Sequence, residues 1–94
     1  MSRLVHFIVA YDVKDDKRRA ELFKFLKGMG FHMQYSVFEG RLPPESIVRL
    51  RYGIRRIIKA SEDRVVLIQL CNACSKKVER FGTQEELPGD IIIV

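Results

Sequence analysis

Three stretches of the chain have the pattern of β-strands. Residues 3–11, RLVHFIVAY, contain too few polar positions for a strand with one face in water, which predicts a central strand of a sheet. Residues 64–70, RVVLIQL, have the same character and predict another buried strand. Residues 76–82, KKVERFG, alternate between polar and apolar positions and predict a short edge strand.

Between the first two of these runs, apolar residues at helical spacing predict two helices. The first helix has Leu22 and Leu26 on its inward face, with Asp15 or Asp16 as a cap and Gly30 as the stop. The second begins at the proline pair 43–44, and its inward stripe has the 3.6-residue period of an amphipathic helix. The stripe consists of Ile47, Leu50, Ile54, Ile57 and Ile58.

The segment that joins the two helices is rich in aromatic and β-branched residues. Residues 31–42, FHMQYSVFEGRL, therefore read as β-structure. They form either one long bent strand or two short strands around residues 34–36, and the absence of a Gly or Asn turn signal leaves both open.

The order of these elements predicts an α+β fold. Strands joined by two helices on one side of an antiparallel sheet give a ferredoxin-like βαββαβ sandwich, which we assign to residues 1–82. Residues 83–94 are expected to be a polar linker and a terminal apolar strand, IIIV. Such a strand pairs with the edge of its own sheet or of a neighbour's, and exchange between identical copies is a simple route to a two-fold homodimer.

Length and composition agree with one small globular domain. The chain has 94 residues, of which 47% are hydrophobic, so disorder is not expected. No apolar run approaches the ~20 residues of a membrane span, and no signal-peptide core is present, so a soluble cytoplasmic protein without a membrane partner is expected.

Positive charge is concentrated in the body of the chain. All 17 Lys and Arg lie within residues 1–80, whereas residues 81–94 contain three acidic residues and no base. A basic body favours nucleic acid as a partner, although solubility alone explains the same charge.

Two cysteines, Cys71 and Cys74, have C-x-x-C spacing. A structural zinc site needs four ligands, but no second pair exists, and His6 and His32 are far away in sequence. A thioredoxin-type pair should open a helix after a strand, whereas this motif follows a strand late in the chain. We therefore expect two reduced, half-buried thiols at a strand end.

Asp12 is the strongest candidate for chemistry, because it lies where the first strand ends. A carboxylate there can bind Mg²⁺ through oxygen, but one carboxylate is a poor site alone. Two copies of Asp12 near a two-fold axis could share one ion and act on a phosphodiester. The simpler reading is that Asp12 caps the turn.

Four further residues are candidates for contacts with nucleic acid. Arg18 and Arg19 open the first helix, and guanidinium groups there suit bidentate phosphate contacts, although they can equally be solvated. Phe38 could stack on a base, and Tyr11 could hold backbone through its hydroxyl; a core position is the competing reading for both rings.

Other catalytic classes have no signal in the sequence. His6 lies inside an apolar strand, where a hydrogen-bonded core imidazole is expected. The chain has no glycine-rich phosphate loop, nucleophile elbow or zinc protease motif. The strand signature of the RNA-recognition module is also missing.

Several motifs together resemble one known family over essentially the whole chain. In order, they are Y-D-V after an apolar strand, D-D-K-R-R opening a helix, Q-Y-S-V-F-E-G, V-V-L-I-Q-L-C-x-x-C and a terminal I-I-V. These look like the small CRISPR-associated protein of spacer acquisition, a family of metal-dependent endoribonucleases that partner the CRISPR integrase.

The resemblance implies a ferredoxin-like homodimer whose carboxy-terminal strand adds to the partner subunit's sheet. It implies Mg²⁺ at Asp12 and nuclease activity on single-stranded RNA or double-stranded DNA. Tyr11, Arg18, Arg19 and Phe38 match family positions associated with the site. It also implies a scaffold role, in which the dimer bridges two integrase dimers around the spacer duplex. A non-catalytic nucleic-acid-binding scaffold and a toxin-type messenger-RNA interferase of the related family stay open as alternatives.

Overall fold

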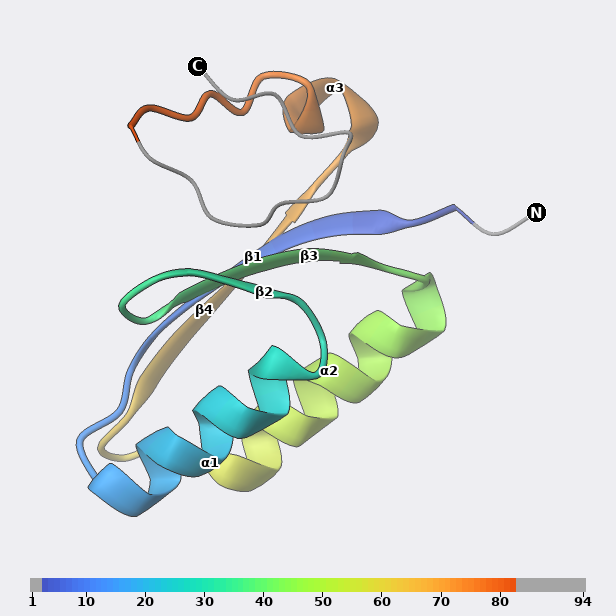
Figure 1. Ribbon diagram of the computed structural model, residues 1–94. Helices are drawn as coiled ribbons and strands as arrows, with labels where there is room; N and C mark the ends of the chain where they lie inside the picture. The colour runs from blue at the N-terminus through green and yellow to red at the C-terminus, as the bar shows by residue number, and fades with distance from the viewer. Residues whose placement is uncertain (1–2, 83–94) are drawn as a thin grey trace.

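The computed structural model describes residues 3–82, which form an α+β fold with a four-stranded antiparallel sheet (Figure 1). The order of strands in the sheet is β2-β3-β1-β4. The predicted ferredoxin-like arrangement is confirmed, and the predicted linker and terminal strand lie outside the described residues. The elements are β1 (Val5–Asp12), α1 (Asp16–Lys27), β2 (Phe31–Gln34), β3 (Val37–Leu42), α2 (Pro44–Ile57), β4 (Arg64–Leu70) and α3 (Asn72–Ser75).

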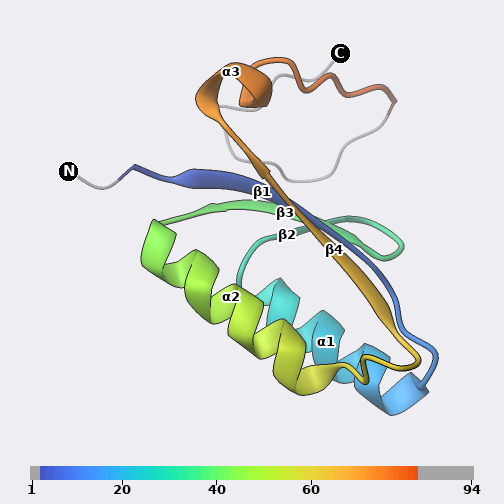
Figure 2. The same ribbon diagram turned by 180° about the vertical axis from the view of Figure 1, so that it is seen from behind.

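The two long helices cover one face of the sheet. Figures 1 and 2 show α1 and α2 side by side beneath the sheet, whereas α3 lies on the other side, at the far end of β4. The core fills the space between the sheet and α1 and α2, because every second residue of the central strands points that way. Its fully buried side chains include Phe7, Val9, Leu22, Leu26, Phe38 and Leu50.

The ends of α1 follow from local chemistry. Asp15 caps the helix, as predicted, and its carboxylate accepts the backbone N–H of Arg18 at 2.9 Å. The helix ends at Lys27 with Gly28 as its cap, two residues before the predicted stop at Gly30. Gly30 has a different role, because a Cβ there would lie 2.7 Å from the carbonyl oxygen of Glu39. It lets the chain pass close to β3.

Residues 31–42 form two strands, which settles the question that the sequence left open. β2 and β3 are joined by a tight turn at Tyr35 and Ser36. Tyr35 takes the left-handed conformation, with φ of 42°, although neither Gly nor Asn occupies the turn. The carbonyl oxygen of Ser36 accepts the backbone N–H of Tyr11 at 3.0 Å, which ties the turn to β1.

Two strand predictions need correction. β4 has the predicted bounds but lies at an edge of the described sheet and pairs with β1 alone. Its side chains alternate, so Val66 and Ile68 are 47% and 43% exposed, where a buried strand was predicted. Residues 76–82 are not a strand; they follow α3 and are held to the sheet by Arg80, which contacts Glu39.

The predicted second helix is confirmed. α2 begins at Pro44 and buries Ile47, Leu50 and Ile54, as its period predicted. No helix in residues 3–82 is both long and apolar enough to cross a membrane.

Candidate metal and phosphate site

Asp12 is the last residue of β1, and its carboxylate is open to solvent. The side chain is 68% exposed, and its Oδ2 lies 3.5 Å from Nζ of Lys14. Pairing of β1 with β4 fixes the backbone here, with Asp12 opposite Arg64. Because Tyr11 belongs to the core beneath the sheet, alternation puts Asp12 on the face that α1 and α2 leave open.

Arg19 lies beside the loop that follows Asp12. Its Nη1 donates to the carbonyl oxygen of Val13 at 2.9 Å, and its Nη2 pairs with Asp16. The side chain is still 44% exposed, and a guanidinium has further donors for an anion. Arg19 therefore stays a candidate for a phosphate contact.

Arg18 is committed elsewhere, which weakens its predicted role in binding nucleic acid. Its Nε donates to Oδ2 of Asp63 at 2.8 Å, and its Nη2 reaches Oδ1 of Asp63 and Oε1 of Glu62, both at 3.2 Å. Only 23% of the side chain is exposed. The fork geometry suits a carboxylate as well as a phosphate, and here a carboxylate of the protein occupies it.

Asp63 is the residue that sequence reasoning missed. Its carboxylate is fully buried and also accepts the backbone N–H groups of Lys14 at 3.1 Å and Lys59 at 2.8 Å. The hydrogen bond from Arg18, together with these N–H donors, outweighs desolvation and holds the pKa of Asp63 well below its usual range. Asp63 thus joins the loop after Asp12, the first turn of α1 and the turn before β4. The signal that the sequence offered for Asp63 was its position directly before β4.

The two aromatic residues that were predicted to contact nucleic acid, Tyr11 and Phe38, are buried. Phe38 has no exposed surface, so its ring offers no face to a base, and the stacking prediction is corrected. It packs instead against Tyr11, with ring centroids 6.3 Å apart, and against Phe23 at 5.3 Å. Tyr11 is 8% exposed; burial raises the pKa of its hydroxyl, despite the opposing effects of a hydrogen bond with Ser36 and the charge of Arg19. The core reading holds for both.

A buried polar network lies on the open face of the sheet, toward α3. Glu39 contacts both His6 and Arg80, and the other ring nitrogen of His6, Nδ1, lies 2.6 Å from Oγ of Ser75. Burial would raise the pKa of Glu39, but hydrogen bonds from Arg80 and His6 outweigh it and lower that pKa. His6 and Glu39 are each 3% exposed, so a substrate has no access. The predicted core imidazole is confirmed, with a structural role.

Apolar side chains stand exposed on the same face of the sheet as Asp12. Ile8 of β1 lies opposite Ile68 of β4, and both point away from the helices. Ile68 and Val66 are nearly half exposed, and Phe31 on β2 is 42% exposed. A contiguous patch of exposed apolar side chains with a polar rim is typical of a protein–protein interface.

The described residues alone provide an incomplete metal site. Asp12 supplies the oxygen ligand that Mg²⁺ prefers, on an exposed strand end. Residues 3–82 contain no group of three or more His, Cys, Asp or Glu side chains that could hold a metal ion. Within the part of the chain that the structure describes, Asp12 therefore fits Mg²⁺ only together with further ligands, such as a second copy of Asp12, water or phosphate.

Comparison with known proteins gives consistent matches. A profile of the family described as CRISPR associated protein Cas2 matches residues 5–78. The CRISPR-associated endoribonuclease Cas2 of Thermus thermophilus is 44% identical over 80 residues, which is 85% of each chain. The crystal structure of Streptococcus pyogenes Cas2 aligns with a TM-score of 0.69 and 27% identity, covering 82% of this chain and 99% of that one.

A solved assembly also contains a similar chain. One chain of a partial Cas6-RT-Cas1–Cas2 complex aligns with a TM-score of 0.66 and 33% identity, covering 79% of this chain and 87% of that one.

Proposed function

The chain belongs to the CRISPR-associated Cas2 family, and we propose that it is an Mg²⁺-dependent endonuclease and a dimeric scaffold of CRISPR adaptation. The curated relatives named endoribonucleases support phosphodiester hydrolysis as the reaction. The complex that contains Cas1 and Cas2 supports a Cas1 integrase as the partner. Single-stranded RNA and double-stranded DNA are the proposed substrates.

The position of Asp12 is the observation that carries the proposal. Its exposed carboxylate shares the open sheet face with the apolar residues Val66 and Ile68. If two copies pack through this face around a two-fold axis, the apolar residues become buried and two Asp12 carboxylates enter the same interface. The second carboxylate that residues 3–82 of one chain do not provide is then supplied by its copy.

Each residue of the site has a defined part in the proposed hydrolysis. The two Asp12 carboxylates would hold Mg²⁺, which would supply charge stabilisation and water activation at the phosphodiester. Lys14, at 3.5 Å from Asp12, balances the negative charge of the carboxylate before the ion binds. In this proposal Arg19 contacts a phosphate of the nucleic acid, which its exposed guanidinium beside Val13 supports. Asp63 holds the loop and the helix that carry Arg19.

The scaffold role needs no cleavage, and a separate observation favours it. The solvent side of α2 is strongly basic, and it is suited to the phosphates of a duplex. Its exposed cations are Arg49, Arg55 and Arg56. Such contacts make binding steeply salt-dependent whether or not Asp12 acts.

A cleavage panel separates the two roles. RNA and DNA substrates are incubated with Mg²⁺ titrated from zero, beside the Asp12→Asn protein and a Glu21→Gln control that removes one exposed carboxylate on α1. We expect Asp12→Asn to abolish Mg²⁺-dependent cleavage and to leave duplex binding near normal. Cleavage retained by Asp12→Asn, or lost equally in Glu21→Gln, would contradict the proposal.

A further inference from the structure

The two cysteines are more accessible to reagents than the sequence predicted. Both thiols are free and exposed, where half-buried thiols were expected. Cys71 directly follows β4, and Cys74 lies within α3, three residues further on. The Sγ of Cys71 accepts the backbone N–H of Cys74 at 3.4 Å, so the two residues are already in contact.

The hydrogen bonds distinguish the two thiols. Donation from the backbone N–H and the thiol of Cys74 lowers the pKa of Cys71. Because the thiol of Cys74 is the donor in its hydrogen bond to Cys71, that bond raises the pKa of Cys74. Because the thiolate is the reactive form, these directions favour Cys71 as the attacking thiol of the pair and Cys74 as the resolving thiol.

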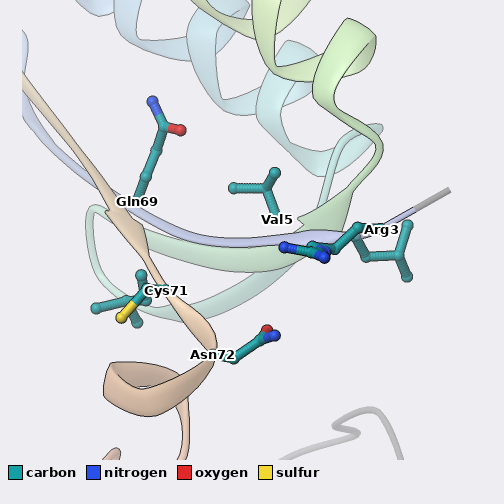
Figure 3. Close-up of a pocket in the computed structure, with 7 residues that line it drawn as sticks. Arg3, Val5, Gln69, Cys71 and Asn72 are labelled. Carbon is teal, nitrogen blue, oxygen red and sulfur yellow. The ribbon is translucent and has the colours of Figure 1, made fainter.

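The surroundings hold the pair in place and leave room beside it. Ser75, next to Cys74, is anchored on the sheet by His6 at 2.6 Å and Arg41 at 3.2 Å. A cavity of about 360 Å³ lies where β1 begins and β4 ends. Figure 3 shows Cys71 and Asn72 on one side of it and Arg3 on the other. Lys76 and Lys77 follow the motif and add positive charge.

We propose that Cys71 and Cys74 form a redox-active dithiol that exchanges with small-molecule disulfides such as oxidised glutathione. The thiolate of Cys71 attacks one sulfur of the small disulfide, forms a mixed disulfide and releases one thiolate, which takes a proton from water. Cys71 gives its own proton to water when its thiolate forms. Cys74 then loses its proton to water, and its thiolate attacks Sγ of Cys71 and expels the second thiolate, which also takes a proton from water. The net change oxidises the two protein thiols to one disulfide and reduces the small disulfide to two thiols.

This site is separate from the proposed nuclease site. Asp12 pairs with Arg64 at the beginning of β4, whereas Cys71 follows its end. Failure of one assignment therefore leaves the other intact. A structural zinc site is less suited to the pair, because residues 3–82 bring no third ligand to the two thiols.

Intact-mass analysis after acid quench tests the dithiol. The reduced protein is incubated with oxidised glutathione at pH 7, beside Cys71→Ser and Cys74→Ser. Serine at position 71 can still accept the N–H of Cys74, and both sites are exposed, so circular dichroism should show both variants folded.

The expected products differ between the three proteins. The unmodified sequence should lose two hydrogens and keep no glutathione, because Cys74 displaces it. Cys74→Ser should accumulate one glutathione on Cys71, and Cys71→Ser should react at least tenfold more slowly. A stable glutathione adduct on the unmodified sequence, equal rates in the two variants, or no reaction would each overturn the proposal.

Discussion

The guanidinium of Arg18 holds the buried carboxylate of Asp63 through two hydrogen bonds, of 2.8 and 3.2 Å. The contact joins residues 45 positions apart and closes the end of the fold at which β1 leaves the sheet. It explains why a basic residue at the start of α1 is turned toward the protein. The position of the loop after Asp12 therefore depends on Asp63, which has no catalytic role in the proposed hydrolysis.

We predict that Asp63→Asn destabilises the fold in a pH-dependent manner. The folded pKa of Asp63 is lowered, so its stabilisation is present above the pKa of the unfolded carboxyl, about 4, and is lost as the pH falls further. Thermal unfolding at pH 7 should show a melting temperature lower by several degrees. The difference from the unmodified protein should shrink below about pH 4.

The matched control for this change is Glu62→Gln, which removes the exposed partner of the same arginine. Glu62 is 48% exposed, and exposed ion pairs contribute little. Its melting temperature should stay near that of the unmodified protein. Equal losses in both variants would contradict the assignment of Asp63 as the anchor.

We predict that Gly53→Ala strains the contact between the two long helices. A Cβ at position 53 would lie 2.1 Å from Cζ of Phe25, so the ring must move out of its place. Overpacking of this kind costs about 1–3 kcal/mol of the free energy of unfolding. Gly28→Ala is the control, because its nearest contact would be an ordinary 3.5 Å. Urea unfolding of both variants measures the difference, and an unchanged midpoint for Gly53→Ala would rule out the close packing.

We predict that Ile68→Glu weakens self-association at least tenfold. The change places a charge on the open sheet face, on β4 opposite Ile8, where the proposed dimer would have to bury it. Val48→Glu adds the same charge to an apolar residue of α2 that is 59% exposed, on the helix layer, and should leave association unchanged. Sedimentation equilibrium distinguishes them; an Ile68→Glu protein that associates normally would exclude this face as the interface.

The sequence predicts the elements and their order well, because periodicity depends on residues close together in the chain. The bounds of β4, the Asp15 cap and the inward stripe of α2 follow from such local signals. The position of Asp12 at the end of β1 follows in the same way.

Contacts between distant residues could not be predicted. An apolar run such as that of β4 looks the same in a central strand and in an edge strand, so its exposure was missed. Arg18 looked free because its partner Asp63 belongs to another element. From its residue type alone, Phe38 could either stack on a base or pack in the core. Only the packing of α1 against β3 shows that it belongs to the core.

Counting the metal ions bound at equilibrium tests the shared Asp12 site most directly. Mn²⁺, which accepts the same oxygen ligands as Mg²⁺, can be counted by its electron paramagnetic resonance signal. We expect one ion for each pair of chains, undiminished binding in Glu21→Gln and loss of binding in Asp12→Asn. One ion for every single chain, or binding of undiminished affinity in Asp12→Asn, would contradict it.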